Sequence, residues 1–215
     1  NHTIKESKES IWIAQREGRA KDSNDKTQPS VLKMLNMAGG ADILTNLAEL
    51  NIVPVAISYE YDPCDYLKAK EFQLKRDNPD YQKNQRDDLL SMETGILANK
   101  GRVHFTLGNR INDELKKLDP KMEKNELFAV IAGIIDREIY RHYRFYPCNY
   151  VAYDMLSGTR HFSANYGLKD KKAFEEYLQG QLDKIVIPNK DEDFLRRKIL
   201  EMYTNPLKNF LSLEK

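Results

Sequence analysis

Two short runs of β-branched and aromatic residues constrain the fold more than any other feature of this sequence. Residues 10–15 are Ser-Ile-Trp-Ile-Ala-Gln, and residues 52–59 are Ile-Val-Pro-Val-Ala-Ile-Ser-Tyr. Both runs have the composition of buried strands. Between them, residues 27–40 and 42–50 show the apolar spacing of helices. This strand–helix–strand order predicts a largely parallel α/β sheet with a crossover connection.

The expected fold class is therefore α/β, with a mostly parallel or mixed sheet flanked by helices. Residues 11–14 and 52–57 should be neighbouring parallel strands, with the loop of residues 16–26 at their carboxyl edge. Residues 102–107 alternate between apolar and polar side chains, which predicts a half-buried strand near a sheet edge. The chain should form one domain, in which residues 1–111 belong to the α/β part and residues 112–215 form a helical extension packed on it.

The clearest helix of this extension has one apolar stripe. Its members share helical spacing; they are Leu127, Phe128, Ile131, Ile134, Ile135 and Ile139.

Composition limits the classes of function. The 34 Lys and Arg residues nearly balance the 33 Asp and Glu residues, and the net charge of +1 argues against a nucleic-acid partner. The chain contains no apolar run of the roughly 18 residues that a membrane span needs. Two cysteines, Cys64 and Cys148, fit a reducing compartment better than a disulfide scaffold. No signal peptide is visible, and because the sequence begins without Met we expect a processed or incomplete piece.

The charged loop of residues 16–26 is the first candidate site. Its candidate binding residues are Arg16, Glu17, Gly18, Arg19 and Lys21. Gly18 lets the backbone approach a ligand. The guanidinium groups of Arg16 and Arg19 can each donate two hydrogen bonds to phosphate oxygens. The alternative is a solvated loop with balanced charges. The loop is not a Walker A motif.

A proline within the second apolar run marks the other candidate. Because proline removes one ladder hydrogen bond, it belongs at a strand start, at an edge or at a bulge. The segment Val53, Pro54 and Val55 therefore forms either a kink that shapes a pocket wall or an ordinary strand start. Further along, Asp65 has the position of an N-cap for a helix that follows.

The histidines do not form a metal site by spacing. His2, His104, His142 and His161 lack the neighbours of a zinc site, and the two cysteines stand alone. We expect surface roles for these histidines and no bound metal. The aromatic residues from Tyr140 to Tyr146 are expected to pack at a helix end rather than to stack on bases.

Three segments resemble one enzyme family. Residues 11–22, Ile-Trp-Ile-Ala-Gln-Arg-Glu-Gly-Arg-Ala-Lys-Asp, resemble the third block of the glycerol-phosphate acyltransferase family, whose core is Phe-Pro-Glu-Gly-Thr-Arg-Ser. Residues 51–57 resemble its fourth block, and residues 100–111 its later strand that ends in Gly-x-Pro-Ile. The whole chain is also similar to a lysophosphatidate acyltransferase-like subgroup of Bacteroides-type bacteria. The resemblance covers residues 10–111 best.

The resemblance assigns roles within the first loop. Glu17 and Gly18 take the Glu-Gly positions, and Arg19 takes the Arg position if the family's Thr is deleted. Glu17 would then bind the glycerol hydroxyls or brace the loop, and Arg19 would bind the acceptor phosphate. Arg16 stands where the family has Pro, and Ala20 where it has Ser. Residues 53–55 would shape the acceptor pocket.

The family's catalytic block is His-x-x-x-x-Asp, in which His is the general base and Asp orients it. Five residues after the four histidines stand Ser7, Asn109, Pro147 and Tyr166, so the block does not occur in this chain. We therefore expect no catalytic residue here, and an N-terminal part that carries the block elsewhere. The chain by itself should be inactive.

The family also implies the reaction and its partners. The expected function is transfer of a fatty acyl group from acyl-CoA or acyl carrier protein to a glycerol phosphate or lysophospholipid, in phospholipid biosynthesis. No further cofactor is implied, and the place of action would be the inner face of the cytoplasmic membrane. The alternatives are a catalytically inactive phosphate- or lipid-binding relative and a protein that binds nucleic acid through the Arg/Lys loop.

Overall fold

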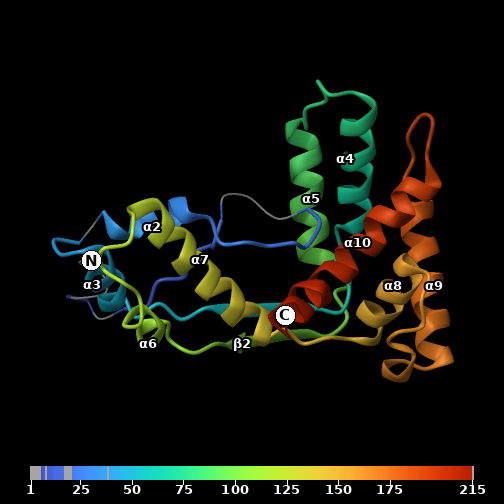
Figure 1. Ribbon diagram of the computed structural model, residues 1–215. Helices are drawn as coiled ribbons and strands as arrows, with labels where there is room; N and C mark the ends of the chain where they lie inside the picture. The colour runs from blue at the N-terminus through green and yellow to red at the C-terminus, as the bar shows by residue number, and fades with distance from the viewer. Residues whose placement is uncertain (1–5, 8, 17–20, 38, 215) are drawn as a thin grey trace. The chain divides into compact units, whose positions relative to one another are not determined.

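The computed structural model describes residues 6, 7, 9–16, 21–37 and 39–214, and 57% of the chain is helical (Figure 1). The described elements are, in chain order, α2 (Pro29–Asn36), α3 (Ile43–Glu49), β1 (Val55–Tyr59), α4 (Asp65–Asp77), α5 (Gln85–Leu97), β2 (Val103–Leu107), α6 (Asn112–Leu115), α7 (Lys124–Arg141), α8 (Pro147–Ser157), η1 (Ser163–Asn165), α9 (Leu168–Asp183), α10 (Glu192–Leu211) and η2 (Ser212–Glu214).

The expected α/β class with a mostly parallel or mixed sheet is wrong. The described residues contain one two-stranded sheet, in which β1 and β2 run antiparallel. Gly108 N donates to Pro54 O across 2.8 Å at one end of the pair, and Glu60 N donates to Arg102 O across 2.9 Å at the other. The chain between the strands forms α4 and α5 and returns in the opposite direction, so no parallel crossover unit is made.

The first predicted strand is also wrong. Residues 10–14 belong to no described helix or strand, and Ile11, Trp12 and Ile13 are 49%, 67% and 50% exposed. Strand propensity expresses how well a side chain fits a pleated, half-buried surface. Neither described strand, β1 or β2, pairs with residues 10–14. A sequence with strand propensity therefore does not form a strand here, because it lacks a partner.

The prediction for residues 102–107 is half right. These residues form β2, but the side chains expected to be buried are exposed: Val103 is 41%, Phe105 60% and Leu107 73% exposed. Alternation predicts which side chains share a face of a strand, whereas burial of that face requires another layer.

The described chain divides into two compact units. Unit 1 comprises residues 1–19, 25–56 and 105–143, and unit 2 comprises residues 20–24, 57–104 and 144–215. The division falls within both strands and between α7 and α8. The helices that follow residue 112 are thus divided between the two units.

Unit 1 contains α2, α3, α6 and α7. The predicted apolar stripe of α7 is confirmed, because all six of its members are buried. Helix α2 packs on α7 and contributes Val31 and Leu32 to this core. Helix α3 begins as expected after residue 41, with Asp42 Oδ1 accepting a hydrogen bond from Thr45 N across 3.1 Å.

Unit 2 is built around α10, which packs on α8, α4 and α9. Its core includes Phe174, Leu178, Leu195 and Ile199, all 1% exposed or less. Polar groups also enter this core, and Asp65, at the first position of α4, is fully buried.

Candidate functional site

The charged loop that follows residue 15 lies partly outside the described residues. Glu17, Gly18 and Arg19 are not described, whereas Arg16 and Lys21 are. The chain that leaves Gln15 returns to it, because Gln28 N donates to Gln15 O across 2.9 Å. The two ends of the loop therefore meet in unit 1. We call these ends, residues 15–16 and 25–28, the neck of the loop.

Arg16, at the start of this loop, has an unused donor. Its Nη1 lies 4.0 Å from Asp25 Oδ1, while its Nε is buried and has no hydrogen-bond partner among the described residues. A buried donor without an acceptor destabilises a protein by about 1–3 kcal/mol. An oxyanion placed at this nitrogen would remove that penalty, and guanidinium groups suit phosphate geometry.

Two contacts with α7 hold the other side of the neck. Tyr140 donates from its hydroxyl to Asp25 O across 3.0 Å, and burial raises the pKa of Tyr140 to about 12. Asp136 Oδ1 accepts from Thr27 N at 2.8 Å and from the Thr27 hydroxyl at 2.6 Å. Burial raises the pKa of Asp136 above its usual range despite these bonds. The neck is therefore anchored to a rigid helix.

Lys21 belongs to unit 2, unlike Arg16. Its ammonium pairs with Glu71 of α4, a carboxylate whose side chain is only 5% exposed. Two more ammonium groups approach the same carboxylate: Lys75 Nζ lies 3.1 Å from Oε1 and Lys83 Nζ lies 3.6 Å from Oε2. Burial raises the pKa of Glu71, but the hydrogen bonds from Lys21 and Lys75 outweigh it, and the pKa lies below its usual range.

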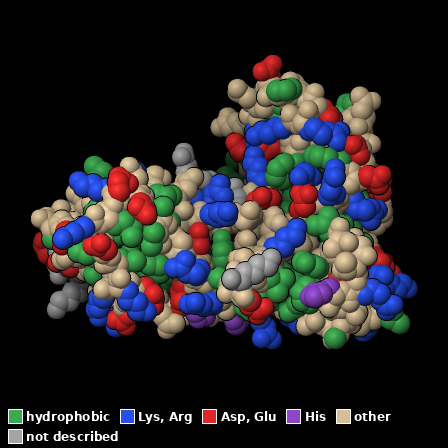
Figure 2. All heavy atoms as spheres, in the orientation of Figure 1, with side chains coloured by type: hydrophobic (Ala, Val, Ile, Leu, Met, Phe, Trp, Pro, Cys, Tyr) green, Lys and Arg blue, Asp and Glu red, His purple; other side chains and the backbone are tan. Residues whose placement is uncertain are grey.

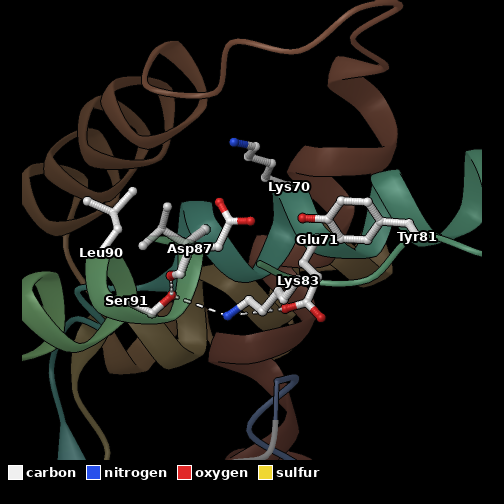
Figure 3. A pocket seen from close by; sticks show the side chains of 8 residues that line it. Lys70, Glu71, Tyr81, Lys83, Asp87, Leu90 and Ser91 are labelled. Carbon is white, nitrogen blue, oxygen red and sulfur yellow. Dashed lines mark hydrogen bonds and ion pairs between the residues drawn. The ribbon is translucent and has the colours of Figure 1, made fainter. Parts of the chain in front are cut away.

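A small pocket lies beside this carboxylate, between α4 and α5 (Figure 3). Its lining residues are Leu67, Lys70, Glu71, Tyr81, Lys83, Asp87, Leu90 and Ser91. Figure 3 shows the Lys83 ammonium between Ser91 and Glu71, and Lys83 Nζ lies 3.3 Å from Ser91 Oγ. Two carboxylates balance two ammonium groups in the lining, so its charge alone does not select an anion.

The strand-start interpretation of Pro54 is confirmed. Pro54 is buried and β1 begins at the next residue, with Val53 exposed and Val55 partly buried. The carbonyl of Pro54 accepts from Gly108 N, and the lining of the α4–α5 pocket includes none of residues 53–55.

No sequence pattern indicated the role of Glu138, a buried residue of α7. Glu138 Oε1 accepts from Asn109 N across 2.7 Å and from Asn109 Nδ2 across 2.9 Å. His142 Nδ1 lies 2.7 Å from the Glu138 carbonyl oxygen, one turn before it on the helix. This contact is typical of a histidine at a helix C-terminus, and the His142 side chain is partly exposed.

Asp65 has a different role from the predicted one. It is the first residue of α4 rather than its cap, and its carboxylate lies in the unit 2 core. Its Oδ2 accepts from the hydroxyls of Tyr177 and Tyr203, each at 2.8 Å, and its Oδ1 accepts from Gln181 Nε2 at 2.7 Å. Burial raises the pKa of Asp65 to about 7. The partners lie more than 100 positions away along the chain, so no local pattern reveals them.

The described residues contain neither a metal-binding cluster nor a membrane-spanning helix. No group of three or more His, Cys, Asp and Glu side chains there is placed to hold a metal ion. No helix within the described ranges is both long and apolar enough to cross a bilayer.

Comparisons with known proteins add no assignment. No protein-family model, no curated protein and no solved structure matches the chain.

Proposed function

We propose that this chain is the acceptor-binding part of an acyltransferase of the glycerol-phosphate type. The enzyme would transfer a fatty acyl group from acyl-CoA or acyl carrier protein to a hydroxyl of a glycerol phosphate or lysophospholipid. The observation that carries the proposal is the buried Nε of Arg16, which lacks an acceptor among the described residues. Arg16 lies within residues 11–22, the segment that resembles the family's third block.

The remaining roles follow from the resemblance. Glu17 and Gly18 would contact the glycerol hydroxyls or brace the loop, and Arg19 would bind the acceptor phosphate together with Arg16. The anchored neck supports this assignment for Arg16, because Tyr140 and Asp136 hold Asp25 and Thr27, and Asp25 lies beside the Arg16 guanidinium. Lys21 is a weaker candidate, since Glu71 already binds its ammonium.

We place the reaction at the inner face of the cytoplasmic membrane, where lysophospholipids are found. One helix face supports contact with a lipid surface. Leu89, Met92 and Ile96 of α5 have i, i+3 and i+7 spacing and are 60%, 54% and 71% exposed, and α5 has no buried residue. Figure 2 shows Lys and Arg side chains beside hydrophobic ones over α4 and α5.

A second candidate is a catalytically inactive relative that binds a phosphorylated lipid. The sequence favours it in one respect, since none of the 215 residues forms a His-x-x-x-x-Asp block. General base catalysis contributes roughly 10²–10⁴-fold to such reactions, so we expect the chain alone to be inactive.

The two candidates are separated by measuring binding and turnover together. Glycerol 3-phosphate and lysophosphatidate are offered with an acyl-CoA or acyl carrier protein donor, first to the 215-residue chain and then to the product of the whole gene. The acyltransferase proposal expects binding by both proteins and acylated product only from the second. Binding without product from either protein supports the inactive relative. Absence of binding to both proteins contradicts both candidates.

A further inference from the structure

Residues 10–14 have the sequence of a strand but no strand partner in the described chain. Their side chains include three consecutive exposed apolar groups, of Ile11, Trp12 and Ile13. The described sheet contains only β1 and β2, so it does not use this segment. The segment ends at Gln15, whose carbonyl accepts from Gln28 N. An exposed, apolar segment with the sequence of a strand and no strand partner can pair with another chain.

We propose that this segment is a dimer interface that pairs, antiparallel, with the same segment of a second copy. The sequence Ser-Ile-Trp-Ile-Ala of residues 10–14 is nearly symmetric about its central residue. With Trp12 on the two-fold axis, Ile11 lies opposite Ile13 of the second copy, and Ser10 lies opposite Ala14. An isologous interface requires this kind of self-complementary patch.

The side chains fit on both faces of such a pair. Because successive side chains of a strand point to opposite faces, Ile11 and Ile13 of the two copies form one cluster of four β-branched side chains. The other face carries Trp12 between Ser10 and Ala14, whose small side chains leave space for the second indole ring. Beyond the centre, Glu9 lies opposite Gln15, so no like charges meet there.

Size determines how stable the dimer can be. One pair of five-residue segments buries much less than the roughly 1,600 Å² of a standard protein interface. We therefore expect a reversible dimer whose population rises with protein concentration. The dimer does not depend on the proposed enzyme function, because no residue of the charged loop of residues 16–26 takes part in it.

The first experiment measures mass by sedimentation and the emission of the single tryptophan over a range of concentrations. The mass should rise from that of a monomer to that of a dimer, while the Trp12 emission shifts to shorter wavelength. Ile13→Lys should abolish both changes, because it places two ammonium groups in the apolar cluster. Val186→Lys is the matched control, since Val186 is 85% exposed and lies outside the segment; it should leave both changes intact.

The second experiment tests the register under a mild thiol oxidant. Residues opposite one another in an antiparallel pair have Cα atoms about 4.5–5.5 Å apart, which a disulfide can bridge. Trp12→Cys should therefore form a covalent dimer, and Ser10→Cys should not, because it faces Ala14 instead. The natural Cys64 and Cys148 are buried. A monomer at all concentrations, a dimer that Ile13→Lys leaves unchanged, or equal cross-linking of the two cysteine variants overturns the proposal.

Discussion

The hydroxyl of Tyr203 donates a hydrogen bond to the buried carboxylate of Asp65 across 2.8 Å, although 138 positions separate the two residues in the chain. This contact joins α10 to the start of α4. The Tyr177 hydroxyl and the Gln181 amide add α9 to the same cluster, within hydrogen-bond distance of the carboxylate. A buried polar cluster whose members lie on three helices specifies how those helices pack, because any other packing leaves the carboxylate unsatisfied.

Asp65 should make the stability of the protein depend on pH. Its pKa is raised to about 7 by burial, against about 3.9 for an aspartate in an unfolded chain. The folded state therefore binds the proton more tightly than the unfolded state, and the stabilisation present below about pH 4 is lost as pH rises through 7. The slope is at most about 1.4 kcal/mol per pH unit.

Asp65→Asn should remove this slope while keeping the cluster, because an amide can still accept from Gln181 and donate to a tyrosine hydroxyl. Urea denaturation of both proteins at several pH values between about 5 and 7.5 measures the slope of the free energy of unfolding against pH. The difference between the two slopes is due to Asp65, since both proteins share the other titrating groups, including Asp136. Asp65→Leu should be less stable than Asp65→Asn at every pH, because it removes the acceptor that the two hydroxyls and the Gln181 amide share. An equal slope in the natural protein and in Asp65→Asn would contradict this account.

Glu71 should stabilise unit 2 by holding three ammonium groups together. Replacing it by glutamine removes the counter-charge of Lys21, Lys75 and Lys83, and we expect a loss of about 1–3 kcal/mol in the free energy of unfolding. Added salt should reduce that loss, because it screens the repulsion between the lysines.

The matched control is Glu176→Gln on α9, an exposed residue paired with Lys172. Exposed pairs contribute about 0–1 kcal/mol, so this variant should change stability little. The pKa of Glu71 is lowered in the fold, so its stabilising effect should be lost as pH falls through that pKa. The interpretation fails if the two variants lose equal stability, or if salt increases the loss in Glu71→Gln.

Two glycines should respond to alanine with opposite signs. A Cβ at Gly108 would lie 2.8 Å from Glu138 Cγ and 3.2 Å from Pro54 O. Glu138 cannot turn away without losing its bonds to Asn109, so Gly108→Ala should destabilise unit 1 by about 1–3 kcal/mol. At Gly180, inside α9, a Cβ meets nothing within 4 Å, and alanine should stabilise by roughly 0.5–1 kcal/mol. Thermal unfolding of both variants measures the difference, and a shift of the same sign in both would refute it.

Features that depend on local sequence were predictable, and features that depend on distant partners were not. The stripe of α7 and the helix expected over residues 42–50 depend on residues a few positions apart, so spacing was enough. Residues 10–15 failed because a strand needs a neighbouring strand, which no local pattern specifies. The direction of the β1–β2 pair was missed for the same reason.

The candidate site also has features that the sequence could predict and features that it could not. The sequence indicated Arg16, but the unpartnered Nε on which the proposal depends is a property of its three-dimensional surroundings. Asp65 shows how sensitive such predictions are to helix boundaries. Its predicted role placed it one residue before the helix, where a carboxylate caps the backbone, whereas at the first helical position it points into the core.

The phosphate role of the loop is tested by kinetics on the product of the whole gene, which the proposed function expects to be active. If Arg19 binds the acceptor phosphate, Arg19→Ala removes a charge-assisted hydrogen bond worth about 1.5–3 kcal/mol. The value of kcat/KM for the phosphorylated acceptor should then fall roughly 10–150-fold. Most of the loss should appear as a raised acceptor KM, because the phosphate is bound in the ground and transition states alike. Arg19→Lys should recover only part of the lost kcat/KM, since an ammonium group cannot bind two phosphate oxygens in the planar geometry of a guanidinium group.

Arg16→Ala should give a smaller effect of the same kind, because its Nε would donate to the same phosphate. The matched control is Arg160→Ala, an exposed arginine outside the loop, which should leave the acceptor KM unchanged. The KM for the thioester donor should hardly change in any of these variants, since the donor does not use the acceptor phosphate site. If Arg19→Ala leaves the acceptor KM unchanged, or weakens donor binding equally, the loop is a solvated surface segment and the acceptor phosphate is bound elsewhere.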